Sequence, residues 1–332
     1  MNDADMNISS LDKRLTAPVV ISVYDRLSHL MRCVESLVVY NIAEKTVLHI
    51  FSDAPAREEH RSRIEEVRSY INTISGFKEV VPHFRPMNMG AHGSILSAFK
   101  EVFESSERLI FLEDDIIVSP HFLRYMNEGL EVYQDDPQML AICAYRLPFK
   151  MPVWYRKDVF LGRRYSPWGV GLWREKFNAV DFAWRDRFKE LQTDKILMEK
   201  SRAVGGDYIH LVEADSKKDI EAMDVRICHH QIVNNQFCLF PRISLSTNIG
   251  FDGSGMHCNT TERFDAALDT RVGYSLKLPK KIKESRLISE RFRRFQDGNQ
   301  GFVENCSRKI KKLLKIIVKK LIINKHDSNT GL

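Results

Sequence analysis

Short apolar runs alternate with segments of helical periodicity over the first 150 residues of the chain. Stretches rich in β-branched and aromatic residues predict strands at residues 18–24, 46–51, 77–84, 109–112 and 139–144. Apolar residues at helical spacing predict helices between them, at residues 30–38, 57–74, 95–103 and 120–134, with a loop at 88–94 before the third helix. This alternation predicts a mostly parallel, doubly wound α/β sheet with helices on both faces over residues 17–150.

The fourth predicted strand ends in three consecutive carboxylates, Glu113, Asp114 and Asp115. Ser119 and Pro120 follow, as an N-cap and first-turn residue of the next helix. Open α/β sheets bind ligands at the carboxyl ends of their strands. A hard divalent cation bridging to a phosphate would relieve the repulsion among these acids. The alternative is a solvated acidic turn that merely ends the strand.

The regular rhythm stops after Pro148, and residues 150–260 are aromatic-rich and irregular. Three segments there have distinctive composition: a tryptophan- and glycine-containing turn at 166–173, the sequence Met-Asp-Val-Arg at 223–226, and a glycine-rich stretch at 248–257. We therefore expect a second, less regular region after the α/β half.

The positive charge of the chain is concentrated near its end. Residues 307–325 carry eight Lys or Arg and no acid, a charge of +8. Because the formal net charge of the whole chain is +6, the remaining residues together carry −2. A general nucleic-acid-binding face is therefore not expected. Ile310, Leu313, Leu314 and Ile317 fall on one helical stripe, which predicts a basic amphipathic helix lying on an anionic membrane surface. A helix packed on the protein or mediating dimerisation is the alternative.

Composition and cysteine usage are those of an intracellular globular protein. The chain has 332 residues, 43% hydrophobic and 28% charged, enough for one large or two modest domains. Its six cysteines form no CxxC pair, which favours free thiols. Residues 1–16 lack the apolar core of a signal peptide, and we expect a cytoplasmic protein, peripheral on the inner face of the cytoplasmic membrane.

Taken together, residues 18–26, 50–53, 112–122, 168–173 and 248–257 resemble the GT-A nucleotide-sugar glycosyltransferases. They are most similar to the inverting N-acetylglucosaminyltransferase I-like family and to bacterial relatives that build surface polysaccharides. The resemblance covers about residues 17–260 and implies a GT-A (Rossmann-like) fold, followed by an irregular acceptor-side region and the C-terminal amphipathic helix.

The resemblance also implies roles for the polar residues at the strand ends. Arg26 and Asp53 correspond to positions that hold the nucleotide, although strand-end residues of this kind also serve as caps or turn formers. Glu113 and Asp114 would support the nucleotide side, and Asp115 would be the protein ligand of Mn²⁺ or Mg²⁺.

Transfer also requires a carboxylate base for the acceptor hydroxyl. The resemblance points to Asp224, although Met223 replaces the tryptophan usual before this aspartate. Asp207 and Asp181 remain alternatives, and a purely structural role for Asp224, pairing with Arg226 or capping a helix, is also open.

Two glycine-containing segments complete the implied site. Trp168 and Gly169 would form a wall beneath donor and acceptor, or else serve as core anchors. Residues 248–257 would form a lid that brings His257 to the metal or phosphates, with a surface hairpin as the alternative.

These observations lead us to expect a metal-dependent inverting glycosyltransferase of surface polysaccharide synthesis, such as O-antigen or capsule. It would use a nucleotide-sugar donor, UDP-linked, and a glycan or lipid-linked saccharide acceptor. We expect the chain to divide into 1–16, 17–150 (donor half), 151–275 (acceptor half), 276–306 (linker and helix) and 307–325 (membrane helix). The alternatives are a nucleotidyltransferase that uses a nucleoside triphosphate and a non-catalytic, membrane-bound sugar-binding scaffold.

Overall fold

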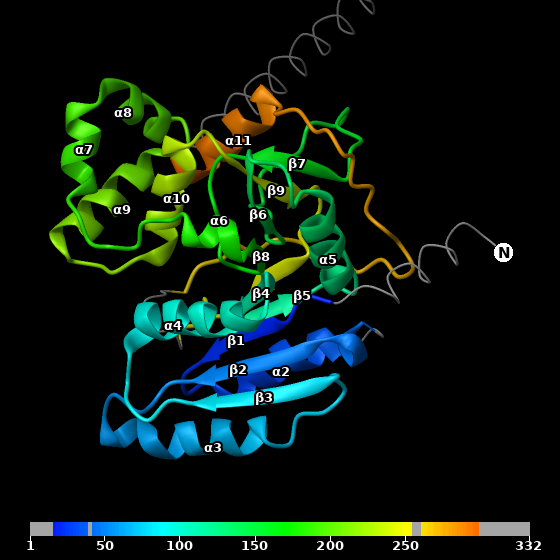
Figure 1. The fold of residues 1–332 in the computed structure, drawn as a ribbon. Helices are drawn as coiled ribbons and strands as arrows, with labels where there is room; N and C mark the ends of the chain where they lie inside the picture. Colours follow the sequence, from blue (N-terminus) through cyan, green and yellow to red (C-terminus); the bar gives the residue numbers. More distant parts are fainter. Residues whose placement is uncertain (1–15, 39–41, 254–259, 299–332) are drawn as a thin grey trace, which may run out of the picture.

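A computed structural model describes residues 16–38, 42–253 and 260–298 of the chain, and everything below concerns those residues. The first half alternates strands and helices as the hydrophobic pattern predicts (Figure 1). Its elements are β1 (Val19–Val23), α2 (Leu27–Val38), β2 (Val47–Ser52), α3 (Arg61–Ile71), β3 (Glu79–Phe84), α4 (Gly90–Ser105), β4 (Arg108–Glu113), β5 (Ile116–Val118), α5 (Phe122–Val132) and β6 (Met139–Cys143).

The second half is more regular than its sequence predicts, since it contains four strands and a cluster of helices. Its elements are β7 (Val159–Gly162), β8 (Val170–Trp173), α6 (Arg174–Asn178), α7 (Arg187–Thr193), α8 (Lys195–Arg202), α9 (Gly206–Lys217), α10 (Met223–Val233), β9 (Phe237–Pro241), β10 (Ser246–Asn248) and α11 (Arg286–Gln296). The expectation of an irregular region over 150–260 is therefore wrong. Its strands are only three to five residues long, which is too short to give a clear period in the sequence.

Both halves contribute to one mostly parallel sheet of eight strands, in the order β3-β2-β1-β4-β8-β6-β9-β7. The pairs β3·β2, β2·β1, β1·β4 and β6·β9 are parallel, whereas β8 runs antiparallel to both β4 and β6. A second sheet of two strands pairs β5 with β10. This α/β architecture confirms the predicted fold class and is consistent with a GT-A, Rossmann-like fold.

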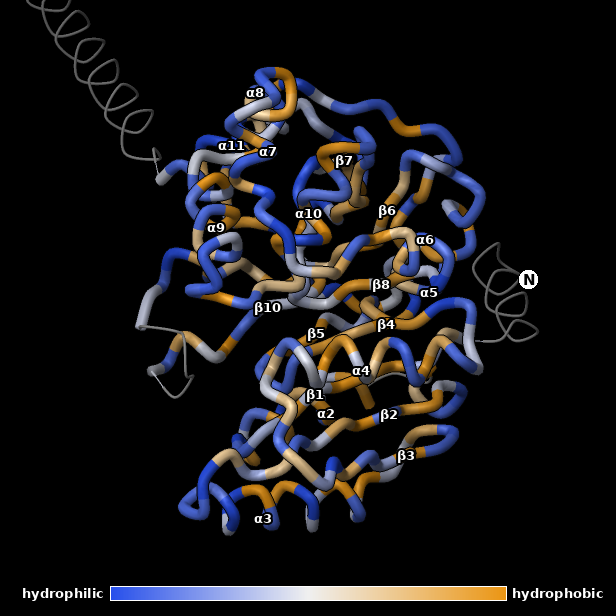
Figure 2. The backbone as a smooth tube through the Cα atoms, turned by 60° about the vertical axis from the view of Figure 1, so that its left-hand side comes forward, coloured by the Kyte–Doolittle hydropathy of each residue, from blue (hydrophilic) through white to orange (hydrophobic). Residues whose placement is uncertain are grey.

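Alternate residues of the central strands pack into two cores, one on each face of the sheet. Along β4, Leu109 and Phe111 join a core with α4 and the α9–α10 region, whereas Ile110 and Leu112 join a core with α2, α3 and α5. A strand that is covered on both faces reads as a continuous apolar run, as β4 does. Figure 2 shows these apolar stretches along the central strands and recurring along α3.

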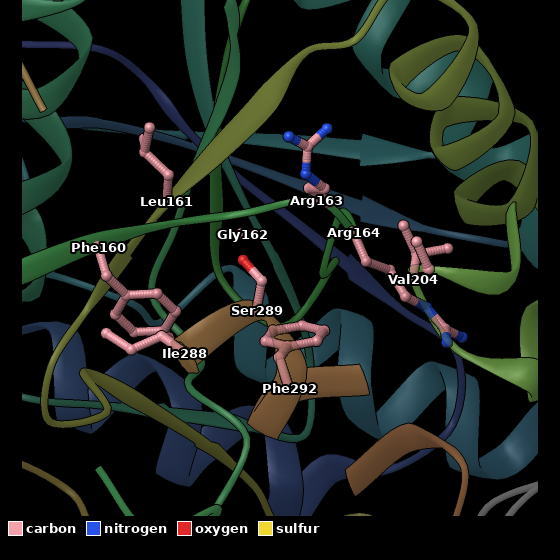
Figure 3. Close-up of a pocket in the computed structure, with 10 residues that line it drawn as sticks. Phe160, Leu161, Gly162, Arg163, Arg164, Val204, Ile288, Ser289 and Phe292 are labelled. Atoms are coloured by element: carbon pink, nitrogen blue, oxygen red, sulfur yellow. The ribbon is translucent and has the colours of Figure 1, made fainter. Parts of the chain in front are cut away.

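Helix α11 covers the outermost strand, β7. Ile288 and Phe292 of α11 and Phe160 of β7 belong to the same core, and Figure 3 shows these side chains together. The gap beside them has a volume of about 10 Å³. Since this is room for about one water molecule, it is a packing gap rather than a ligand site.

Two local boundaries differ from the predicted ones. Helix α4 begins at Gly90, so most of the predicted 88–94 loop is its first turn. Helix α5 begins at Phe122 with His121 as N-cap, because residues 116–118 form β5 and Ser119 accepts a hydrogen bond from the His121 backbone N–H. Ser119 is thus not the N-cap.

Within the described ranges, no helix is both long and apolar enough to cross a bilayer. The four cysteines located there, Cys33, Cys143, Cys228 and Cys238, are buried free thiols. The predicted amphipathic helix at 307–325 lies outside the described residues.

Candidate active site at the carboxyl edge of the sheet

The predicted site residues of the first half meet at one edge of the sheet. Strands β1, β2 and β4 are parallel, with Ser22 opposite Glu113 and Val23 opposite Ser52. Their carboxyl ends therefore lie side by side, which brings together Arg26, Asp53 and the three acids after β4. We call Glu113, Asp114 and Asp115 the acidic edge.

One arginine serves the acidic edge. The Arg26 guanidinium donates from Nη2 and Nε to Asp114, the latter at 3.3 Å, and from Nη2 to Asp115 Oδ2 at 2.9 Å. Asp114 and Asp115 are both buried, at 3% and 6% exposed. A single cation therefore faces more than one buried carboxylate, and negative charge remains in excess.

The pKa values of the acidic edge show this excess. Burial raises the pKa of Glu113 to about 8, and the charges of Asp115 and Asp114 add to the shift. Burial also raises the pKa of Asp114 to about 7, although the Arg26 guanidinium acts in the opposite direction. Carboxyls whose pKa lies this far above the ordinary range are typical of sites that take up a cation or a proton.

The β5–β10 pair brings the glycine-rich segment onto Asp115. Asn248 pairs with Ile116, and the Ile249 N–H donates to the Asp115 carbonyl at 2.9 Å. A Cβ added at Gly250 would lie 2.1 Å from Asp115 Oδ2. This contact explains the glycine, because any side chain would displace the carboxylate.

The start of the predicted lid is thus held against the acidic edge. Asp252 Oδ2 lies 3.2 Å from His29 Nε2 on α2, and the Phe251 ring packs edge-on against Trp168, with 5.4 Å between centroids. His257 and the rest of the predicted lid, residues 254–257, lie outside the described residues.

Asp53 has a clear local role. Its carboxylate accepts hydrogen bonds from the backbone N–H of Ala54 at 2.9 Å and of Met89 at 3.0 and 3.1 Å. Burial raises the pKa of Asp53, and these N–H groups partly offset the shift. The residue therefore orders the turn that leads into α4, and its contact with a nucleotide stays a prediction.

Asp224 approaches the acidic edge from the second half. It is half-buried in the first turn of α10, and its charge contributes to the raised pKa of Glu113. Burial raises the pKa of Asp224 itself, and the Arg164 guanidinium offsets part of the shift. A carboxyl with a raised pKa beside the acidic edge is suited to proton transfer.

The structure bears on both alternatives to Asp224 as the base, namely a structural role for Asp224 and another acid in its place. Arg226, the suggested ion-pair partner of Asp224, turns instead to Asp215, with Nη2 at 3.0 Å from Oδ1. Asp207 is held by Arg164 Nη1 at 2.8 Å from both carboxylate oxygens, and Asp181 is exposed beside Arg185. The charge of Asp224 acts on Glu113 and raises its pKa.

Trp168 and Gly169 lie beside the site, but Trp173 does not. Trp168 packs against Tyr145, Phe251 and Phe264. Gly169 has φ +86°, and a Cβ there would approach Phe122 and Ala144. Residues 170–173, predicted as part of a turn, form β8, and Trp173 is a core anchor opposite Arg108 at the other end of β4.

His92 is a further candidate for the site, which the sequence analysis did not identify. It lies in the first turn of α4, and its buried Nδ1 has no hydrogen-bond partner among the described residues. Burial lowers its pKa, while the Glu221 carboxylate, 3.5 Å from Nε2, and Asp224 act in the opposite direction. The glycines at 90 and 93 were the available signal, since they mark a helix start that a ligand can approach closely.

In the part of the chain that the structure describes, no three His, Cys, Asp or Glu side chains are grouped so as to hold a metal ion by themselves. The donor set at the acidic edge nevertheless fits a hard cation, because it offers carboxylate oxygens with uncompensated charge. Such an ion would complete its shell with oxygens from a ligand.

Comparisons with known proteins do not assign a function to the chain. No family model matches the chain, and no curated protein does. Two structures of TarS from S. aureus are similar in part: each is 9% identical, covers 70% of this chain and has a TM-score of 0.39. The matched region spans 59% of the TarS 1–349 structure and 36% of the longer TarS structure. A likeness this slight assigns neither a family nor an activity.

Proposed function

We propose that the chain is a metal-dependent inverting glycosyltransferase that moves a sugar from a nucleotide-sugar donor, UDP-linked, to a glycan or lipid-linked saccharide. The observation that carries the proposal is the acidic edge: of three acids at the end of a central strand, Asp114 and Asp115 share one arginine, and the backbone at Gly250 packs closely against Asp115. The predicted roles in surface polysaccharide synthesis and at the inner face of the cytoplasmic membrane, through residues 307–325, belong to the same proposal.

Each group has a chemical task in this scheme. Asp115, supported by Asp114, would hold Mn²⁺ or Mg²⁺ with the donor diphosphate. When bound, the cation would stabilise the charge that develops on the departing phosphate. Arg26 would be shared between the carboxylates and the phosphates, and Asp53 would keep the nucleotide-side turn in place.

Asp224 would take the proton of the acceptor hydroxyl as the nucleophile attacks the anomeric carbon. Two observations support this assignment: the charge of Asp224 acts on Glu113, and Arg226 bonds to Asp215 rather than to Asp224. Trp168 would offer a ring face to the sugar, and the loop after β10 would exclude water when a donor is bound.

The test is a thermal-shift panel of nucleotides and nucleotide sugars, each with Mn²⁺ and with a chelator. We expect the melting temperature to rise with a UDP-sugar only when metal is present. At a donor concentration a hundredfold above Kd, binding should raise the free energy of unfolding by about 2.7 kcal/mol. Asp115→Ala should abolish this response. Asp224→Asn should keep it while losing sugar transfer.

Other results would redirect the assignment. A response to a nucleoside triphosphate alone, with pyrophosphate release, would favour a nucleotidyltransferase. Donor affinity in Asp115→Ala equal to that of the unmodified chain would exclude Asp115 as the metal ligand. Retained transfer by Asp224→Asn would move the base to another acid, and the lack of any ligand response would favour the scaffold.

A further inference from the structure

A wide groove lies beside β7, at the far edge of the sheet from β3. It has a volume of about 840 Å³, and its two walls are residues 154–158, before β7, and residues 277–279 with 283–285, before α11. Figure 1 shows the segment before α11, in orange, passing along this side of the molecule. We call this feature the β7 groove.

The two acids of the β7 groove are engaged in building it. Asp158 accepts hydrogen bonds from the Tyr274 hydroxyl at 2.5 Å and from the Lys277 backbone N–H at 2.9 Å. Glu284 receives two hydrogen bonds from the Arg163 guanidinium, at 2.5 and 2.6 Å. Both carboxylates therefore hold the walls together.

The cations around the groove outnumber its acids. Six exposed Lys and Arg side chains lie on or next to its walls, and none has an acidic partner among the described residues. They are Arg156, Lys157, Lys277, Lys280, Lys281 and Lys283. So many unpaired positive charges within two short segments would attract an anionic surface.

The loop that enters the groove also exposes two adjacent apolar side chains. Val153 is 88% exposed and Trp154 is 61% exposed. By contrast, the exposed Trp184 is covered by the Lys218 ammonium, 4.3 Å above its ring. An exposed tryptophan followed closely in the sequence by Arg156 and Lys157 is typical of segments that enter the headgroup region of a bilayer.

We propose that the β7 groove and the Val153–Trp154 tip bind the surface of an anionic lipid bilayer. The lysines would contact headgroup phosphates, and Trp154 would insert at the level of the headgroups. A soluble anionic polymer would engage the lysines but would gain nothing from the exposed valine, so the tip favours the bilayer. This surface contains none of residues 307–325, and the inference does not depend on the proposed sugar transfer.

The experiment measures binding of the full chain to vesicles of phosphatidylcholine, with and without about one-third phosphatidylglycerol. The combined variant Lys277→Glu, Lys280→Glu, Lys281→Glu and Lys283→Glu should weaken binding to the anionic vesicles at least about tenfold, and added salt should weaken the binding of the unmodified chain. Trp154→Ala should weaken binding by a smaller factor that persists at high salt.

Matched variants separate this surface from overall charge. Glutamates at Lys78, Lys100, Lys189 and Lys195, which are also exposed or at the surface away from the groove, change the net charge equally and should lower affinity only about twofold. Trp184→Ala is the control for Trp154→Ala. Unchanged melting temperatures and an unchanged donor response in every variant would show that the fold and the active site are intact.

The inference is overturned if the groove and control variants lose the same affinity, or if the groove variant binds vesicles like the unmodified chain. It is also overturned if the groove variant loses only its retention on a soluble polyanion such as heparin. Failure of the donor experiment would leave this result untouched, because vesicle binding is measured without donor.

Discussion

Acids in two regions of this molecule differ in how many cations neutralise them. Asp215, on α9, faces two guanidinium groups: Arg226 Nη2 lies at 3.0 Å from Oδ1, and Arg187 Nη1 lies at 3.9 Å from Oδ2. At the acidic edge, Asp114 and Asp115 share the single guanidinium of Arg26, with Glu113 beside them. One acid has two cations in the first group, whereas three acids have one cation in the second.

The difference separates a structural cluster from a site. Asp215, Arg226 and Arg187 come from α9, α10 and α7, so their contacts tie three helices together. The acidic edge instead keeps carboxylates with raised pKa values at the end of a strand, where the fold alone does not neutralise them. Crowding acids in this way costs stability, and binding a proton or a cation there would offset that cost.

The largest expected effect comes from neutralising one acid in each group. Asp215→Asn leaves two buried arginines without their carboxylate and should lower the free energy of unfolding by about 3–5 kcal/mol. Asp114→Asn also removes repulsion among the acids, and Arg26 keeps Asp115, so it should change the free energy of unfolding by less than about 1 kcal/mol. Urea unfolding of both variants measures the contrast.

An exposed acid near Asp215 provides a control for Asp215→Asn and Asp114→Asn. Asp181→Asn removes an exposed acid beside Arg185 and should leave stability within about 0.5 kcal/mol of the unmodified chain. Equal losses in Asp215→Asn and Asp114→Asn would show that the acidic edge is a structural ion-pair cluster like the other, and the comparison would fail.

A second, smaller effect probes the fit of the loop on the acidic edge. In Gly250→Ala, the new Cβ would lie 2.1 Å from Asp115 Oδ2 and 3.0 Å from Arg26 Nη1, so the carboxylate or the loop must move. Metal-dependent donor affinity should fall at least about tenfold, or about 1.4 kcal/mol. Titration of the melting temperature with donor and Mn²⁺ measures the change.

Gly273→Ala is the matched control. Gly273 has φ +70° with nothing near its missing Cβ, so alanine there should cost about 1 kcal/mol of backbone strain and leave donor affinity unchanged. If Gly250→Ala binds donor as tightly as Gly273→Ala does, the contact with Asp115 has no part in ligand binding.

The sequence predicted the first half of the fold and the acids of the site because both have local signals. The run from Leu109 to Leu112 is apolar throughout because β4 is buried on both faces, and the carboxylates follow directly. Strand β5 and its partner β10 could not be predicted in this way. Their pairing joins residues 116–118 to 246–248, and such short strands have no period of their own.

The same long-range pairing explains which site features were missed. Gly250 reaches Asp115 only because β10 lies beside β5. From the sequence alone, the glycines of this segment therefore indicate a lid rather than close packing on Asp115. Strand β8 was read as a turn because of its glycines. Gly171 faces Leu130, and a Cβ there would lie 3.1 Å from Leu130 Cγ, so the glycine serves helix packing within a strand.

The smallest expected effect concerns a third way to bury titratable groups, in which charge is suppressed rather than paired. His49 Nδ1 and His83 Nε2 lie 3.0 Å apart, so one nitrogen must accept a hydrogen bond and both cannot be protonated. Burial lowers the pKa of His49, and the charge of His83 lowers it further. Burial also lowers the pKa of His83, while Glu101, 2.7 Å from its Nδ1, acts in the opposite direction.

A lowered pKa in the folded state means that the unfolded chain binds more protons as the solution becomes acidic. The stability from this pair is therefore fully present above about pH 6.5, the ordinary pKa of histidine, and is lost as the pH falls below it. His49→Gln should reduce the loss of unfolding free energy between about pH 7 and about pH 5 by about 1 kcal/mol. His210→Gln, at an exposed position of α9, should leave that loss unchanged. Equal pH profiles for the two variants would assign the acid sensitivity to other groups. The acidic edge would not be among them, because carboxyls whose pKa is raised by folding make the protein more stable as the pH falls.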